Sequence, residues 1–215
     1  MTPEFFERNF ETFPWLGGAE IPISWIPAEQ LAALTDADSP RGVIALARLT
    51  RPKAAELFAS QSVLEKEEAS LPWVYLDTIQ DPRNLGAIAR AAEAFGAPGL
   101  LLSPGCAHPN HPRALRGSAG SLLRLSVGVE VSLEDLATYF PKQTFWAGLV
   151  ARGGSRIRRG TTGTALLAVG SEGRGLHPEL EARLDERWTI PLCPPVESLN
   201  VAVALGICLY ELAKP

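Results

Sequence analysis

Between residues 73 and 215, short apolar runs alternate with longer segments in which apolar positions recur every three or four residues. The short runs predict buried strands, and the longer segments predict helices that pack against them. Strands are predicted at 73–77, 99–102, 125–131, 144–150, 165–169 and 188–192, and helices at 84–95, 112–119, 132–140, 177–184 and from Val201 onward. This alternation predicts an α/β fold with a mostly parallel, doubly wound sheet, in which ligands bind beyond the carboxyl ends of the strands.

A different pattern precedes these elements. Residues 21–49 predict a small α/β fragment made of a strand, a helix over AEQLAAL, a turn at DADSPRG and a strand at 42–49. A helical stretch near 52–58 and a polar segment at 60–72 follow. We therefore predict a small N-terminal substrate-binding-like region with its connector at 1–68, and a larger domain at 69–215.

The last helix is apolar around its whole circumference but has a polar start. Val201 to Leu209 would be buried on every side, whereas Glu197, Ser198 and Asn200 come just before them. Such a start lies in solvent, caps the helix or faces a ligand. Cys193-Pro194-Pro195 prevents the helix from beginning earlier.

Two further loops at the predicted carboxyl ends are unusual. In DTIQDPRNLGAIARAAEAFGA (77–97), Arg83 and Arg90 share a helix face with small alanines, so a ligand can approach it closely. In LLAVGSEGRGL (166–176), glycines follow a buried strand, but their spacing matches neither a dinucleotide fingerprint nor a P-loop. Glu172 in that loop would repel a pyrophosphate, which favours a ligand without phosphate or with a positive charge.

Composition narrows the class of protein. The 215 residues are 46% hydrophobic and 20% charged, and no stretch approaches the roughly 18 apolar residues of a membrane span. The start, MTPEFFERNF, is unlike a signal peptide, so we expect a cytoplasmic protein. Three cysteines, Cys106, Cys193 and Cys208, make a disulfide framework unlikely and predict reduced thiols.

The net charge of −4 conceals an uneven distribution. Residues 1–76 hold 11 acidic and 6 basic side chains, whereas Arg113 to Arg159 hold 8 basic and 3 acidic ones. A local excess of positive charge is typical of a surface that binds a polyanion, although solvated arginines on ordinary loops explain it equally well.

Three stretches together carry a family resemblance. QDPRNLGAIARAAEAFG, AVGSEGRGL and IPLCPPVESLNVAVALGICLYE, in this order, resemble the three signature motifs of the SpoU-type (TrmH-like) RNA ribose 2'-O-methyltransferases of the SPOUT superfamily. The resemblance covers about residues 73–215, and residues 20–50 resemble the end of a small ribosomal-protein-like RNA-binding domain, here truncated. It implies a C-terminal trefoil knot, a homodimer, S-adenosyl-L-methionine as methyl donor and tRNA or rRNA as substrate.

The resemblance also implies roles for single residues. The implied cofactor-binding residues are Gly170, Glu172, Gly173, Ile190, Leu192 and Leu199. The implied catalytic residues are Arg90, Asn84, Ser198 and Asn200, with Ser198 and Asn200 bonded to Arg90 or to the substrate. The arginines expected to contact RNA phosphates are Arg83, Arg113, Arg116, Arg152, Arg156, Arg158 and Arg159.

Several alternatives stay open at this point. A catalytically inactive RNA-binding or assembly factor is favoured by the truncated N-terminal region and by Cys193-Pro194-Pro195, which would stiffen the cofactor loop. Cys106, His108 and His111 are too few for a typical structural metal site, so no metal is expected. Ser198 lacks the G-x-S-x-G setting of a hydrolase nucleophile. Neither composition nor motif distinguishes tRNA from rRNA.

Overall fold

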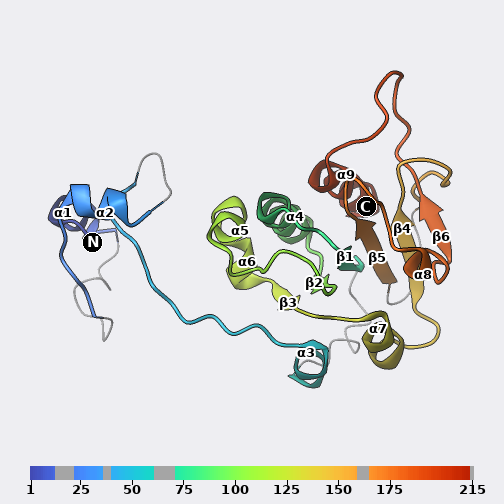
Figure 1. Cartoon of the computed structure of the whole chain (residues 1–215), viewed down its shortest axis with the longest axis horizontal. Helices are drawn as coiled ribbons and strands as arrows, with labels where there is room; N and C mark the ends of the chain where they lie inside the picture. Colours follow the sequence, from blue (N-terminus) through green and yellow to red (C-terminus); the bar gives the residue numbers. More distant parts are fainter. Residues whose placement is uncertain (13–21, 36–39, 61–70, 159–164, 214–215) are drawn as a thin grey trace. The chain divides into compact units, whose positions relative to one another are not determined.

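The computed structural model describes residues 1–12, 22–35, 40–158 except 61–70, and 165–213. These residues form two compact units, Met1–Leu49 and Thr50–Pro215 (Figure 1). The boundary predicted at 68/69 falls within 61–70, outside the described residues. None of the described helices combines the length and the apolarity that crossing a membrane requires.

The first unit contains two short helices, α1 (Pro3–Asn9) and α2 (Ala28–Ala33). Thr2 caps α1, because its hydroxyl accepts a hydrogen bond from the Phe5 amide at 3.3 Å. The strands predicted within 21–49 are wrong for the described residues: 22–27 and 42–49 form no strand, and Leu46 is fully exposed. Residues 42–49 are rich in aliphatic side chains, but within the described parts of the chain no strand pairs with their backbone groups.

The second unit is built on one sheet of six parallel strands in the order β3-β2-β1-β5-β4-β6, which confirms the predicted α/β fold. Its strands are β1 (Trp73–Asp77), β2 (Gly99–Leu102), β3 (Ser126–Gly128), β4 (Phe145–Leu149), β5 (Ala165–Gly170) and β6 (Glu186–Trp188). Its helices are α3 (Ala54–Ser60), α4 (Pro82–Phe95), α5 (Pro112–Gly117), α6 (Ser121–Arg124), α7 (Leu133–Tyr139), α8 (Pro178–Glu181) and α9 (Val201–Ala213).

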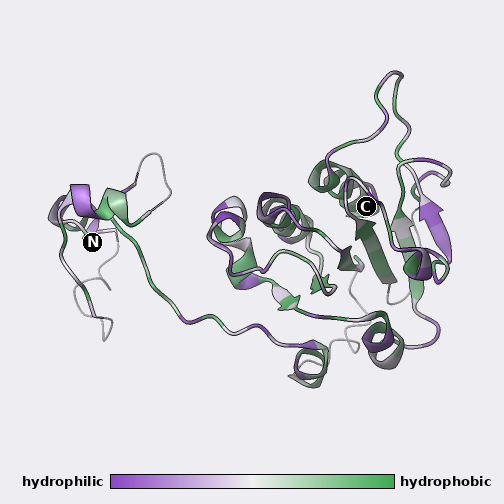
Figure 2. Ribbon diagram, in the orientation of Figure 1, coloured by the Kyte–Doolittle hydropathy of each residue, from purple (hydrophilic) through white to green (hydrophobic). Residues whose placement is uncertain are grey.

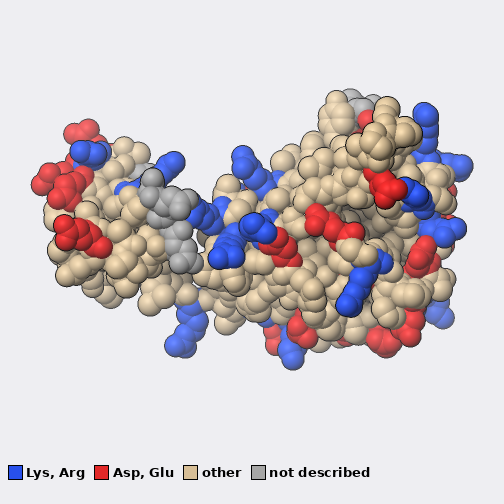
Figure 3. Space-filling model, turned by 45° about the horizontal axis from the view of Figure 1, so that its top comes forward, with Lys and Arg blue, Asp and Glu red and all other residues tan. Residues whose placement is uncertain are grey.

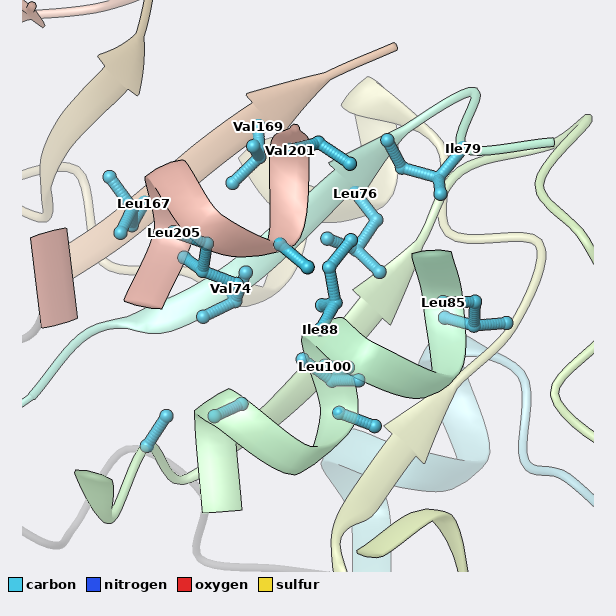
Figure 4. Close-up of a cluster of buried hydrophobic side chains, with 14 of the residues drawn as sticks. Val74, Leu76, Ile79, Leu85, Ile88, Leu100, Leu167, Val169, Val201 and Leu205 are labelled. Atoms are coloured by element: carbon cyan, nitrogen blue, oxygen red, sulfur yellow. The ribbon is translucent and has the colours of Figure 1, made fainter. Parts of the chain in front are cut away.

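The sheet is buried on both faces, as a parallel sheet requires. On one face, Val74, Leu100 and Leu167 pack against α4 and α9 through residues such as Ile88 and Leu205 (Figure 4). On the other face, the alternate positions of the same strands pack against α3, α7 and α8. Figure 2 accordingly shows hydrophobic residues along β1, β2 and β5, and hydrophilic ones along the edge strand β6.

Three predicted elements differ clearly in their bounds from the structure, whereas the bounds of the other predicted strands and helices between 73 and 213 agree to within two residues. The strand predicted at 188–192 is β6 at 186–188, because Thr189 donates to the Ser155 carbonyl instead of to β4, and Pro191 has no amide to donate. The helix predicted at 177–184 ends at Glu181. The strand predicted at 125–131 is limited to 126–128, since Glu130 has a left-handed φ of 55°.

The strand order reverses direction between β1 and β5. The chain runs from β1 outward through β2 and β3 on one side, whereas β4 and β6 lie on the other side of β5. In open α/β sheets, ligands bind beyond the carboxyl ends of the strands near such a reversal. The long segment between β6 and α9 returns to this edge (Figure 1).

Candidate active site

A pocket of about 430 Å³ opens at the carboxyl ends of β4 and β5. Its walls come from the residues after β4, from the glycine loop after β5 and from the segment that leads into α9. All six predicted cofactor-binding residues line it, and Ser198 lines it as well: Gly170, Glu172, Gly173, Ile190, Leu192 and Leu199. Residues from two separate motif loops therefore meet in one cavity.

The glycine loop after β5 is a closed turn. Gly175, with φ of 69°, donates its amide to the Ser171 carbonyl at 2.9 Å. A Cβ atom on Gly170 would collide with the Gly175 carbonyl, so only glycine fits at 170. The buried carboxylate of Asp77, at the end of β1, accepts a hydrogen bond from the His177 amide at 2.6 Å. This bond attaches the end of the glycine loop to the neighbouring strand.

Asn200 connects the three motif loops. Its Nδ2 donates to Asn84 Oδ1 on α4 at 3.0 Å and to Glu172 Oε1 in the glycine loop at 2.7 Å. Its Oδ1 accepts from the amides of Ala202 at 3.0 Å and Val203 at 3.4 Å, so Asn200 is also the N-terminal cap of α9. Both polar atoms of this amide are thus used within the protein.

The structure separates Arg90 from this cluster. Arg90 is exposed on α4, as the helical spacing predicted, but it is not among the residues that line the pocket. Within the described residues no hydrogen bond joins Arg90 to Ser198 or Asn200, and the donors of Asn200 go to Asn84 and Glu172 instead. The cap of α4 is Asp81, whose side chain accepts from the Arg83 amide at 2.8 Å.

The seven predicted phosphate-binding arginines fall into two groups. Arg83 pairs with Asp81 at 2.8 Å, Arg152 with Glu197 at 2.7 Å and Arg158 with Glu186 at 3.7 Å. Arg113, Arg116 and Arg156 are exposed, and Arg159 lies outside the described residues. Lys and Arg side chains gather in Figure 3 over the part of the second unit that holds α5 and α6. The hydrogen bonds from Arg83 lower the pKa of Asp81.

Cysteine and histidine side chains near the site have other partners. Burial raises the pKa of Cys106, whose thiol donates to the Leu76 carbonyl at 3.2 Å. His108 and His111 each accept a backbone amide through Nδ1. Within the described parts of the chain, no three His, Cys, Asp or Glu residues are grouped to hold a metal ion. Pro194 and Pro195 line a second hollow, which shares Ile190 and Leu192 with the main pocket.

Sequence reasoning missed several residues of this site. Asp77 was interpreted only as the end of a strand, although a carboxylate at a buried strand terminus is a signal for a structural hydrogen bond. Ser171, Arg174 and Glu181 also line the pocket. Their place there depends on how the turn closes and how α8 packs, which no short motif encodes.

Comparison with known proteins places this geometry in a family. Residues 72–210 match the model of the SpoU rRNA Methylase family. The chain is 38% identical over 143 residues to an "uncharacterized tRNA/rRNA methyltransferase" of Mycobacterium sp. (strain KMS), covering 66% of this chain and 46% of that protein. The chain thus spans about half the length of the curated relatives it matches.

Two solved structures are similar in fold and sequence. The SpoU methyltransferase AviRb from Streptomyces viridochromogenes, in complex with the cofactor AdoMet, is 28% identical with a TM-score of 0.61, covering 68% of this chain and 60% of that one. A structure on the 2-OH methylation of C/U34 on tRNA is 30% identical with a TM-score of 0.58, covering 65% of this chain and 87% of that one.

Proposed function

The chain belongs to the SpoU rRNA methylase family, and on that premise we propose that it transfers a methyl group from S-adenosylmethionine to a ribose 2'-hydroxyl of tRNA or rRNA. The observation that carries this proposal is Asn200, which binds Asn84 on α4 and also binds Glu172 in the pocket that the other two motif loops form. The neighbour that concerns 2-OH methylation of tRNA supports the choice of the ribose.

The pocket fits S-adenosylmethionine in size and in chemistry. A volume of about 430 Å³ suits a ligand of that size, since such pockets range from about 300 to 1,000 Å³. Ile190, Leu192 and Leu199 would hold the adenine, and the backbone of Gly170 and Gly173 would hold the rest of the nucleoside. Bound there, the donor supplies an electrophilic methyl group on a sulfonium cation. The Glu172 carboxylate, fixed by Asn200 at 2.7 Å, is compatible with that positive charge.

Arg90 would orient the ribose. An arginine side chain stays protonated at neutral pH, so it is a poor general base. We assign it a clamp role, in which the guanidinium binds the phosphate next to the target ribose, aligns the 2'-oxygen and stabilises the negative charge that develops there. Its exposure on α4 leaves it accessible to RNA.

The other implied catalytic residues have different roles. Ser198 lines the pocket with an exposed side chain and would donate a hydrogen bond to the ribose or its phosphate. Asn84 and Asn200 bind each other at 3.0 Å, and we propose that they position α4 against the cofactor loop. Glu197 holds its own loop through the ion pair with Arg152.

RNA phosphates would bind first to the arginines that form no ion pair among the described residues, Arg113 and Arg156, and to Arg116. To bind RNA, Arg83, Arg152 and Arg158 must each give up an ion pair with a carboxylate for one with a phosphate. This exchange reduces the net gain in the free energy of RNA binding. Arg159 belongs to the same arginine-rich segment of the sequence.

We also propose three properties that the family resemblance implies. The C-terminal segment that runs from β6 into α9 would form a trefoil knot, and two chains would form a homodimer in the cytoplasm. Residues 20–50 would correspond to the end of a ribosomal-protein-like RNA-binding domain.

Calorimetry with S-adenosylmethionine tests the proposed function. Micromolar protein should bind the cofactor with a dissociation constant in the micromolar range, corresponding to about −8 kcal/mol. The matched control is Gly170→Val, whose side chain would fill the position that the Gly175 carbonyl occupies. If the wild-type protein releases no heat of binding and its thermal unfolding is unchanged by the cofactor, the methyltransferase assignment is wrong.

A further inference from the structure

The segment that leads into the second unit lies against the loop before α5. Arg51 Nε donates a hydrogen bond to Asn110 Oδ1 at 2.8 Å, across 59 residues of sequence. Neither segment brings negative charge to this contact, because residues 50–55 and 94–129 contain no Asp or Glu. The contact therefore joins two parts of the chain whose ionisable side chains are all basic or histidine, apart from Cys106.

Two histidines on this loop present hydrogen-bond donors to solvent. His108 Nδ1 accepts from the Asn110 amide and His111 Nδ1 accepts from the Arg113 amide, both at 3.1 Å. A neutral imidazole whose Nδ1 accepts must carry its proton on Nε2. Because both side chains are exposed, both rings offer an Nε2–H outward without needing to be charged.

Two guanidinium groups complete the set of donors. Arg113 is exposed and forms no salt bridge within the described residues. Arg51 is half-buried, and its Nη2 is buried without a hydrogen-bond acceptor among those residues. A buried donor without an acceptor is unfavourable, and a ligand oxygen would pair with this one when the side chain turns outward. Arg83, Arg152 and Arg158, by contrast, are each paired with a carboxylate.

This group of donors adjoins the candidate active site. Gly86 on α4 lets α5 approach so closely that a Cβ at 86 would lie 2.6 Å from the Ala114 carbonyl. The Ala107 amide donates to the Ile79 carbonyl at 2.8 Å, which holds the loop before α5 beside the loop that follows β1. The donors therefore lie next to the start of α4, which carries Asn84 and, farther along, Arg90.

We propose that Arg51, His108, His111 and Arg113 form a docking surface for the RNA backbone, here called the α5 donor surface. The inference rests on the proposed function and names the part of the chain that holds the substrate. The carboxylate of Asp81 lies near Arg113 but is paired with Arg83. A surface of donors in which the neighbouring carboxylate is already paired matches phosphate oxygens and ribose hydroxyls, which accept hydrogen bonds, and reads no base. It would hold the RNA strand that continues from the nucleotide at Arg90.

Binding of labelled bulk tRNA and of total rRNA, measured by fluorescence anisotropy over a series of salt concentrations, tests this proposal. The variants are Arg51→Gln, Arg113→Gln and the pair His108→Asn with His111→Asn. Asparagine keeps an acceptor for the backbone amides that Nδ1 now binds, so the loop and the α5 cap are retained. Each variant should weaken binding about three- to tenfold. The two arginine variants should also reduce the salt dependence of binding by about one phosphate contact, whereas the histidine pair, which donates while neutral, should leave the salt dependence unchanged.

The matched control is Lys142→Glu, an exposed cation in the turn before β4, which is separated from β2 in the sheet by β1 and β5. It should leave RNA affinity within about twofold of wild type, since screening limits charges farther apart than about 10 Å. Thermal unfolding and cofactor calorimetry verify that each variant is folded. If the α5 variants bind RNA like Lys142→Glu while the wild type binds both RNA and cofactor, the surface is wrong and the proposed function stands. If the wild-type protein binds neither tRNA nor rRNA, both the α5 donor surface and the proposed function are wrong.

Discussion

Asn200 performs three structural tasks with one amide group. It caps α9, binds Asn84 on α4 and fixes the Glu172 carboxylate at the pocket. The motif predicts that this asparagine belongs to the site, and the geometry assigns it to positioning rather than to contact with the ribose. A side chain of this kind affects cofactor affinity through the loops it joins.

Two substitutions at Asn200 separate its tasks. Asn200→Ala loses the cap and both donors, so the free energy of unfolding should fall by about 1 kcal/mol and cofactor affinity by about tenfold. Asn200→Asp keeps the capping oxygen but sets a second carboxylate against Glu172, so it should retain more stability and still lose cofactor affinity. Urea unfolding and calorimetry measure the two quantities. Wild-type cofactor affinity in both variants would contradict the positioning role.

For single residues, the sequence predicted which ones belong to the site better than it predicted which other residues they contact. All six residues that the motifs assign to cofactor binding line the pocket, because glycines and apolar side chains at fixed spacing imply a loop geometry. They did not predict that Arg152 pairs with Glu197, or that Asp77 binds the His177 amide. These partners are 45 and 100 residues apart in sequence, so only the folded chain determines which carboxylate each donor meets.

At the scale of elements, strands buried on both faces were predicted most accurately. Trp73–Asp77 and Gly99–Leu102 have the predicted bounds, since a continuous apolar run has only one way to be buried in a parallel sheet. Edge elements were predicted less well. Residues 42–49 have the composition of a strand without a partner, and β6 ends at Trp188 because the next backbone groups pair outside the sheet.

The close packing of α4 on α5 depends on Gly86. Alanine at this helix position would gain up to about 1 kcal/mol from propensity alone. Its Cβ, however, would lie 2.6 Å from the Ala114 carbonyl and 2.9 Å from the Gly117 backbone. Gly86→Ala should therefore lower the free energy of unfolding by about 1–3 kcal/mol in urea titrations. Gly173→Ala, which meets nothing within 4 Å, is the control and should stay near wild type. A stabilised Gly86→Ala protein would contradict the close approach.

Helix α4 is also linked to α6 by an ion pair with a defined pH dependence. Arg124 donates to both carboxylate oxygens of Glu93, and these hydrogen bonds lower the Glu93 pKa from 4.5 to about 2. Because the folded-state pKa is the lower one, the pair stabilises the protein above pH 4.5 and loses this effect as the pH falls toward 2.

The difference in urea midpoint between wild type and Glu93→Gln measures this contribution. Glutamine keeps the shape and an acceptor but removes the charge. The difference should be full at pH 7 and shrink steadily below pH 4.5. A difference that stays constant from pH 7 to pH 3 would show that the charge of Glu93 contributes nothing.

At the scale of the molecule, the carboxyl edge of the parallel sheet determines where chemistry can occur. The pocket lies at this edge, among the residues that follow β4, the glycine loop after β5 and the segment that leads into α9. The alternation of strands and helices predicted a ligand site at this edge before any motif was considered. The path of the chain from β6 to α9 could not be predicted in that way, because periodicity carries no information on how distant segments pass each other.

One apolar face of α9 remains exposed in the single chain. Val203 and Tyr210 are each 51% exposed and Ile207 is 37% exposed, on the stripe opposite the buried Leu205 and Cys208. Burial raises the pKa of Cys208 to about 12, in keeping with a dry inner face. The exposed stripe suits the interface of the proposed homodimer.

Light scattering tests that assembly. The wild-type chain of 23.1 kDa should have twice its mass at tens of micromolar, because a stable dimer buries such a stripe. Val203→Asp with Ile207→Asp should give the monomer mass, whereas Leu123→Asp, a control at an exposed leucine of α6, should remain dimeric. A monomeric wild type at these concentrations would refute the homodimer.

Analysis of the methylated nucleosides tests the central claim most directly. Total RNA from a strain that lacks this gene is incubated with the protein and S-adenosylmethionine, digested to nucleosides and examined by mass spectrometry. The account predicts a new 2'-O-methylated nucleoside with the wild-type protein, and at least about a hundredfold less of it with Arg90→Ala, because the clamp acts on the developing charge. A methyl group on a base, or equal background methylation with both proteins, would contradict it.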